Sequence, residues 1–185
     1  YYSGYVTDSG GRIYANYMNG KLEEENLIEV LNKDGSLDKA YGRRNKFKYE
    51  SSVHNEVILS LENNIFIYAL WKHFNILKKY SLDGKLLFEK TIKNKIFNNI
   101  SEENDSMMKP ADHSVTARVL FTGFYVKAGK LFIMKQYPRL EIYECKENGD
   151  IDHVYWADTT YNYIGEGLAV VNDDKNMYFV TVQSF

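Results

Sequence analysis

The side chains best suited to binding a ligand occur in short, loop-like segments. Trp71 and His73 stand together in the segment Trp71–Asn75, where an indole can stack on a flat ligand and an imidazole can form a hydrogen bond to it. Tyr137 and Arg139 flank a proline, and the Arg139 guanidinium could hold a carboxylate with two hydrogen bonds. Each pair also has a plainer interpretation, in which the rings pack between structural units and the arginine is solvated.

Three more candidates complete the predicted ligand-binding set. Arg118 and Glu166 each stand at the start of a predicted strand, and His113 lies in the connection Lys93–Arg118. This connection is the longest and most polar in the chain. A loop of this length is usually functional or solvated, so it could serve as a lid, as a partner contact or as a simple insertion.

Motifs that specify a reaction or a tightly bound cofactor are missing from the sequence. It contains no Gly-rich phosphate loop, no His-Glu-x-x-His, no cysteine pair and no Gly-x-Ser-x-Gly. The single cysteine, Cys145, stands in an alternating strand-like run and is interpreted as a small buried hydrophobe. The sequence therefore predicts no catalytic residues, no cofactor and no tightly bound transition metal.

Composition narrows the class of protein further. Among the 185 residues the net charge is −2, which provides no field for gathering nucleic acid, and no stretch is apolar enough for a membrane span. Aromatic residues make up 15% of the chain while prolines number only 2. Aromatic side chains favour strands, since a ring packs well on a pleated surface.

An internal repeat predicts the elements that would position these candidates. Four segments share an apolar run, a turn of Gly, Asn or Asp, and a second apolar run, which is the pattern of a β-hairpin. A second hairpin with Asp-Gly or Asn-Gly at its turn follows the first three. The predicted turns are Gly10–Gly11, Asp34–Gly35, Asn63–Asn64, Asp83–Gly84, Gly129, Asn148–Gly149 and Asp173–Asp174.

Each predicted unit thus has four antiparallel strands, and the turn glycines Gly35, Gly84 and Gly149 are 49 and 65 residues apart. Four-stranded units in tandem without sustained helical periodicity predict an all-β fold, a β-propeller with about 3.5 blades and no helices. The expected divisions are blades at 1–48, 52–95 and 117–158, an insertion at 96–116 and a half blade at 164–185.

The blades resemble the C-terminal portion of six-bladed TolB-like and NHL-type bacterial propellers. The resemblance rests on the phrases Asn64–Tyr68, Tyr80–Leu86 and Gly165–Val170. It implies a six-bladed ring completed by blades of the same protein that precede Tyr1, and export to the periplasm or cell surface. Because such propellers include enzymes, ligand binders and scaffolds, the resemblance is more specific for fold than for activity.

Three functions remain open at this point. The leading hypothesis is a non-catalytic module that binds a small molecule, a glycan or a protein partner at the face of the propeller channel. The second is a lactonase or hydrolase with a channel metal, because Gly165-Glu166-Gly167 is similar to the entry to an inner strand in gluconolactonase-type propellers. The third is a structural scaffold that holds other subunits through its blade edges.

Overall fold

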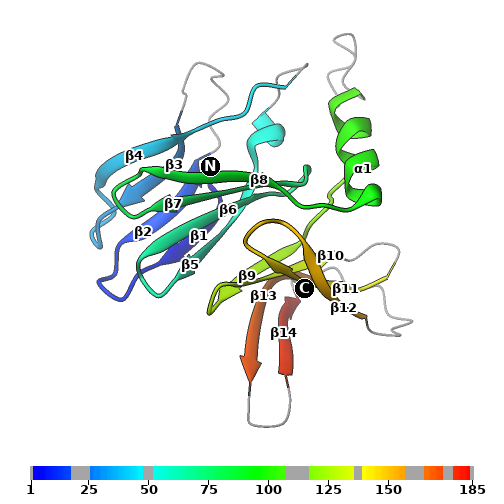
Figure 1. Ribbon diagram of the computed structural model, residues 1–185. Coiled ribbons are helices and arrows are strands. Elements are labelled where there is room, and N and C mark those ends of the chain that lie inside the picture. Colours follow the sequence, from blue (N-terminus) through cyan, green and yellow to red (C-terminus); the bar gives the residue numbers. More distant parts are fainter. Residues whose placement is uncertain are drawn as a thin grey trace.

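The computed structural model shows an almost entirely β structure. It describes residues 2–17, 26–47, 52–106, 117–135, 139–156, 165–172 and 177–183. Their strands form three four-stranded sheets and one two-stranded sheet, each antiparallel and each ordered as in the chain (Figure 1).

The strands of each sheet follow one another along the sequence. The first sheet contains β1 (Tyr2–Thr7), β2 (Ile13–Tyr17), β3 (Asn26–Leu31) and β4 (Leu37–Arg43). The second contains β5 (Val57–Glu62), β6 (Phe66–Trp71), β7 (Ile76–Ser81) and β8 (Leu86–Thr91). The third contains β9 (Gly123–Lys127), β10 (Lys130–Lys135), β11 (Glu141–Lys146) and β12 (Ile151–Trp156), and the last contains β13 (Gly165–Asn172) and β14 (Met177–Gln183).

The predicted turns account for these hairpins. Asn63 and Asn64 have φ of 52° and 54°, the left-handed conformation that a two-residue hairpin turn requires. Gly35 and Gly84 have φ of 84° and 97° and end turns closed by backbone hydrogen bonds. Six of the seven predicted turns are confirmed, whereas Asp173–Asp174 lies outside the described residues.

The first strands of the sheets lie side by side, β1 against β5, β5 against β9 and β9 against β13. The Ser60 hydroxyl on β5 accepts a hydrogen bond from the Val126 amide on β9 (3.0 Å), and the Glu62 carboxylate accepts one from the Gly129 amide (2.7 Å). Because the paired residue numbers rise together, these inner strands run parallel. Four successive sheets, each with its own inner strand beside that of the next sheet, make a β-propeller arrangement. It has three complete blades and two strands of a fourth.

Hydrophobic side chains fill the space between neighbouring blades. Tyr14, Ile28 and Trp71 belong to the core between the first two blades, and Phe124 and Tyr143 to the core between the second and third. The second and third blades therefore bury their two faces against different neighbours, and their inner strands are held in place from both sides.

The expectation that the chain has no helices was wrong. Helix α1 (Lys95–Ser106) occupies the predicted insertion, and Asn94 caps it by accepting a hydrogen bond from the Ile96 amide (2.8 Å). Only Phe97 and the partly buried Ile100 provide an apolar contact, because the third residue on this face is the buried Asn104. The apolar periodicity was therefore too weak to indicate a helix.

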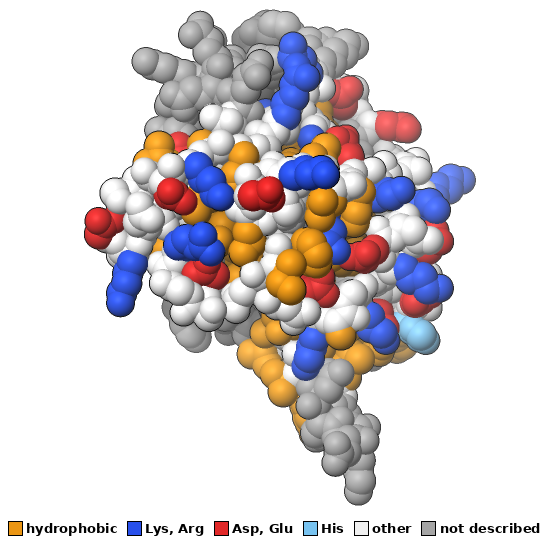
Figure 2. Space-filling model, turned by 60° about the vertical axis from the view of Figure 1, so that its left-hand side comes forward, with side chains coloured by type: hydrophobic (Ala, Val, Ile, Leu, Met, Phe, Trp, Pro, Cys, Tyr) orange, Lys and Arg blue, Asp and Glu red, His pale blue; other side chains and the backbone are white. Residues whose placement is uncertain are grey.

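The surface of the described part mixes charges of both signs. On the face seen in Figure 2, acidic and basic side chains are interspersed around apolar ones, without a broad patch of one sign. Neither α1 nor the short 3-10 helix η1 (Ser52–Asn55), the helices among the described residues, has the length and apolar character needed to cross a membrane.

Candidate functional site

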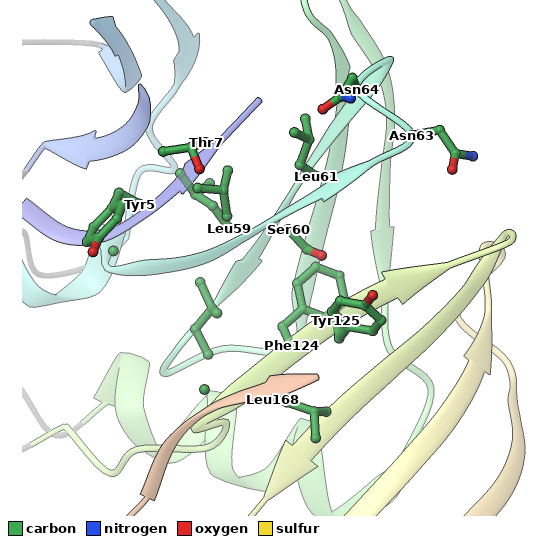
Figure 3. Close-up of a pocket in the computed structure, with 14 residues that line it drawn as sticks. Tyr5, Thr7, Leu59, Ser60, Leu61, Asn63, Asn64, Phe124, Tyr125 and Leu168 are labelled. Carbon is green, nitrogen blue, oxygen red and sulfur yellow. The ribbon is translucent and has the colours of Figure 1, made fainter. Parts of the chain in front are cut away.

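The inner strands of all four sheets line an open groove of about 570 Å³. Figure 3 shows β1, β5, β9 and β13 converging on it, with Ser60 directed toward Phe124 and Tyr125. The lining residues are Gly4, Tyr5, Val6, Thr7, Ile58, Leu59, Ser60, Leu61, Asn63, Asn64, Phe124, Tyr125, Gly167 and Leu168. The propeller repeat, rather than a single loop, builds this groove.

The lining of the groove is uncharged and combines rings with hydroxyl and amide groups. Tyr5 is 71% exposed, Thr7 and Asn63 are exposed, and Tyr125 is half-buried. No Asp, Glu, Lys, Arg or His is among the lining residues. Such a surface can stack on a ring and form hydrogen bonds, but it offers no opposite charge to an ionic ligand.

Glycine allows the inner strands to approach closely beside this groove. A Cβ atom on Gly123 would lie 2.9 Å from the Leu168 Cβ, and one on Gly4 would lie 3.3 Å from the Val57 carbonyl oxygen. The Gly167 amide in turn donates to the Thr122 carbonyl at 3.1 Å. These contacts fix the width of the groove through the backbone.

The structure places Trp71 in the core rather than on a binding surface. Its side chain is fully buried between the first two blades, and its indole N–H faces the Asn55 amide oxygen at 3.3 Å. The Lys78 ammonium lies 4.9 Å from the ring centroid. The ring is therefore not exposed for stacking on a ligand, which contradicts the role expected for it.

His73, the other aromatic candidate in this segment, is also buried. Its Nε2 lies 3.2 Å from the Glu56 carboxylate and its Nδ1 lies 3.2 Å from the Arg118 carbonyl oxygen. The imidazole thus joins the start of β5 to the segment before β9. Its hydrogen-bonding capacity serves the protein rather than an external ligand.

The two arginine candidates are exposed and engaged in ion pairs. The Arg118 guanidinium lies 2.9 Å from the Glu103 carboxylate on α1. The Arg139 guanidinium lies 2.9 Å from the Glu141 carboxylate and 5.2 Å from the Trp156 ring centroid. Neither guanidinium reaches the groove, so the structure provides no cation there for an anionic ligand.

The remaining candidates are only partly described. Tyr137 and His113 lie outside the described residues. The backbone of Glu166 pairs with Val182 at the start of β13, next to the groove residue Gly167, but its side chain is not described. The proposed roles of these three residues remain predictions.

Sequence reasoning missed a polar cluster that we call the His73 junction, formed by Glu56, Lys72, His73, Asn104 and Arg118. The Lys72 ammonium lies 3.0 Å from the Glu56 carboxylate. The Asn104 amide on α1 donates to the carbonyl oxygens of His73 (2.6 Å) and Arg118 (2.9 Å). Burial raises the pKa of the Glu56 carboxyl, but the hydrogen bonds from His73 and Lys72 outweigh it and leave this pKa below its ordinary value.

A second cluster, the Glu62 junction, closes the opposite end of β5 and consists of Glu62, Tyr68, Lys79, Gly129 and Glu147. The buried Glu62 carboxylate accepts from the Gly129 amide (2.7 Å) and from the Tyr68 hydroxyl (2.8 Å). The Lys79 ammonium lies 2.5 Å from the Glu147 carboxylate. Burial together with the two carboxylates raises the pKa of Tyr68, so its hydroxyl stays a donor.

Metal-binding groups do not gather within the described part of the chain. No cluster of three His, Cys, Asp or Glu side chains occurs there. Cys145 is buried, and burial raises the pKa of its thiol to about 12, which suits a packing role.

Comparison with known proteins supports the fold. No family model and no curated protein sequence matches the chain. Among solved structures, it is similar to a catalytically inactive virginiamycin B lyase from Staphylococcus aureus with quinupristin, with a TM-score of 0.52 and 16% identity over 89% of this chain and 44% of the lyase. The yeast (Saccharomyces cerevisiae) protein Sqt1 gives a TM-score of 0.59 and 9% identity over 97% of this chain and 43% of Sqt1.

Glutaminyl cyclase from Myxococcus xanthus is a third similar structure, with a TM-score of 0.52 and 11% identity over 97% of this chain and 67% of the cyclase. All three are β-propellers, which agrees with the architecture described above. The chain spans about half the length of the lyases it matches. At these identities the likeness establishes the fold and leaves the activity to be argued from the site.

Proposed function

We propose that this chain is a propeller binding module whose ligand occupies the groove between the inner strands. The observation that carries the proposal is that the inner strands of all four sheets line one open groove of about 570 Å³. Concave sites of this size are where proteins usually bind small molecules or short segments of larger ones. A small molecule, a glycan or a segment of a protein partner could each fill it.

The chemistry of the lining favours an uncharged ligand over an anionic one. Tyr5 and Tyr125 offer ring faces, while Thr7 and Asn63 offer hydroxyl and amide groups. A charged ligand would lose hydration in the groove without gaining an opposite charge. The expected ligand is therefore neutral and amphipathic, with at least one face that can lie against a tyrosine ring.

The test is a binding screen of neutral and charged fragments and oligosaccharides by saturation-transfer NMR. Thr7→Arg should fill the groove from an exposed position and weaken binding of the neutral hits at least about tenfold. The matched control, Thr91→Arg, places the same side chain on the exposed outer strand β8 and should leave binding unchanged. A screen without neutral hits, or hits that bind Thr7→Arg as well as the original chain, would count against the proposal.

A further inference from the structure

Four polar side chains in the wall of the groove have no hydrogen-bond partner within the described part of the chain. They are the hydroxyls of Tyr5, Thr7 and Tyr125 and the amide of Asn63. Tyr5 and Thr7 come from β1, Asn63 from the turn after β5, and Tyr125 from β9 (Figure 3). Three blades therefore present unpaired donors and acceptors to one open space.

Neighbouring polar side chains of the same wall hold the blades together instead. The Ser60 hydroxyl accepts a hydrogen bond from the Val126 amide at 3.0 Å. The Asn64 side-chain amide donates to the Ser9 hydroxyl at 3.0 Å, which joins the turn after β5 to the turn after β1. The hydrogen-bonding groups of the four unpaired side chains take no part in these contacts, so they are available to a ligand.

A ligand that covers these groups must replace their hydration, because a polar group covered without a partner costs free energy. Hydroxyl and amide groups both donate and accept, so hydroxyl groups on the ligand can satisfy them. Leu59, Leu61 and the two tyrosine rings add apolar surface beside them. The ligand therefore needs uncharged hydroxyl groups at its edges and an apolar face, a combination typical of a sugar ring.

We propose that the ligand of the groove is a short neutral oligosaccharide. Its hydroxyl groups bind the unpaired hydroxyls and the Asn63 amide, and the C–H face of one of its rings lies against a tyrosine ring. This inference rests on the proposed function of the groove and names the class of its ligand.

An uncharged extended peptide fits the groove less well. A peptide that adds to the edge of a sheet gains its affinity from a run of free backbone groups. At the inner edges the amides of Val57, Val126 and Gly167 already bind groups of a neighbouring blade. Recognition then depends more on side-chain hydroxyl and amide groups, which suit a saccharide.

The test is isothermal titration calorimetry with the neutral probes maltotetraose, cellotetraose and tetra-N-acetylchitotetraose. At least one should bind the original chain. Tyr5→Phe and Tyr125→Phe remove a hydroxyl but keep the ring, and each should weaken binding about fivefold. Asn63→Gly should have a similar effect, and glycine tolerates the φ of 52° at this position. Tyr178→Phe is the matched control, because Tyr178 is exposed on β14 outside the groove lining, and it should leave binding unchanged.

Two further probes, benzyl alcohol and an acetylated, amidated alanine–threonine hexapeptide, separate this inference from the proposed function. If either binds and is blocked by Thr7→Arg while no tetrasaccharide binds, the saccharide inference is overturned and the groove remains a binding site. A tetrasaccharide that binds Thr7→Arg, or the hydroxyl and amide variants, as well as the original chain also overturns the inference. If none of the probes binds, both proposals fail.

Discussion

The two ends of the inner strand β5 are both closed by a glutamate, buried Glu62 at one end and half-buried Glu56 at the other, but with different partners. At one end Glu62 accepts from a backbone amide and a tyrosine hydroxyl, with Lys79 nearby. At the other end Glu56 faces Lys72 and His73. The same strand is thus tied to the turn of the third blade at one end and to the contacts of helix α1 at the other.

The difference also shows which end carries the connection between blades. Glu62 reaches from the second blade to the Gly129 turn of the third, so its contact is part of the repeat. The His73 junction instead attaches α1, an element that the other blades lack among the described residues. An inserted helix needs its own attachment, and α1 combines the polar contacts of Asn104 with the apolar contact of Phe97 in the core between two blades.

The strongest test of this comparison is Glu62→Ala. It leaves the Gly129 amide without its acceptor and removes one acceptor of the Tyr68 hydroxyl, and it should lower the free energy of unfolding by about 3 kcal/mol. Glu62→Gln keeps an acceptor oxygen and should cost clearly less. Urea unfolding of the three proteins measures this, and a loss below about 1 kcal/mol for Glu62→Ala would contradict the role of Glu62 in tying β5 to the third blade.

Asn104→Ala tests the end of β5 at the His73 junction. The change removes two donors and one acceptor that tie α1 to the backbones of His73 and Arg118, so a loss of about 2 kcal/mol is expected. Glu102→Ala changes an exposed residue of the same helix and serves as control. Equal unfolding free energies for the two variants would show that the junction does not hold α1.

Tyr68→Phe and Tyr14→Phe compare equivalent positions in two blades. Each tyrosine follows its acid by six residues, but the single Tyr68 hydroxyl proton lies between two carboxylates, those of Glu62 and Glu147, whereas Tyr14 donates to Asp8 alone, at 3.2 Å. Tyr68→Phe should cost about 1.5 kcal/mol and Tyr14→Phe about 0.5 kcal/mol by urea unfolding. The reverse order would mean that the Glu62 junction adds little beyond the repeat.

The smallest expected effect is the pH dependence contributed by Glu56. Its pKa is lower in the folded chain than the ordinary value of 4.5, so its interactions stabilise the fold above that pH and are lost as the pH falls through the folded value. The difference in unfolding free energy between the original chain and Glu56→Gln should therefore shrink below about pH 4. A difference that stays constant on acidification would show that Glu56 is not held as an ion by His73 and Lys72.

The fold could be predicted because its signals are local. Turns such as Asn63–Asn64 and Asp83–Gly84 need residues that adopt positive φ, and their regular recurrence indicated hairpins in tandem. Helix α1 was missed because its buried face contains Asn104, which contributes hydrogen bonds instead of apolar periodicity. A polar residue on a buried face has no distinguishing mark in a single sequence.

The candidate site could be predicted only in outline. The site was expected at the channel face, among the loops that carry the candidate residues. The groove lies along the inner strands, and Trp71, His73, Arg118 and Arg139 are not among its lining residues. Residue type suggested what each side chain could do, and spacing suggested that strand ends would gather. Neither indicated that Trp71 would be covered by the neighbouring blade.

The sequence by itself determined the hairpins, their order and the repeat, since backbone conformation at the turns depends on residues a few positions apart. Only the tertiary structure decided which side chains meet. The Glu62 carboxylate binds the amide of Gly129, which is 67 residues away in the sequence. The His73 ring contacts the carbonyl of Arg118, which is 45 residues away. Both contacts form because stacking of the blades brings those backbones together. Contacts of that kind depend on the packing of whole sheets, so no local pattern specifies whether a tryptophan, a histidine or a glutamate ends up buried, paired or exposed.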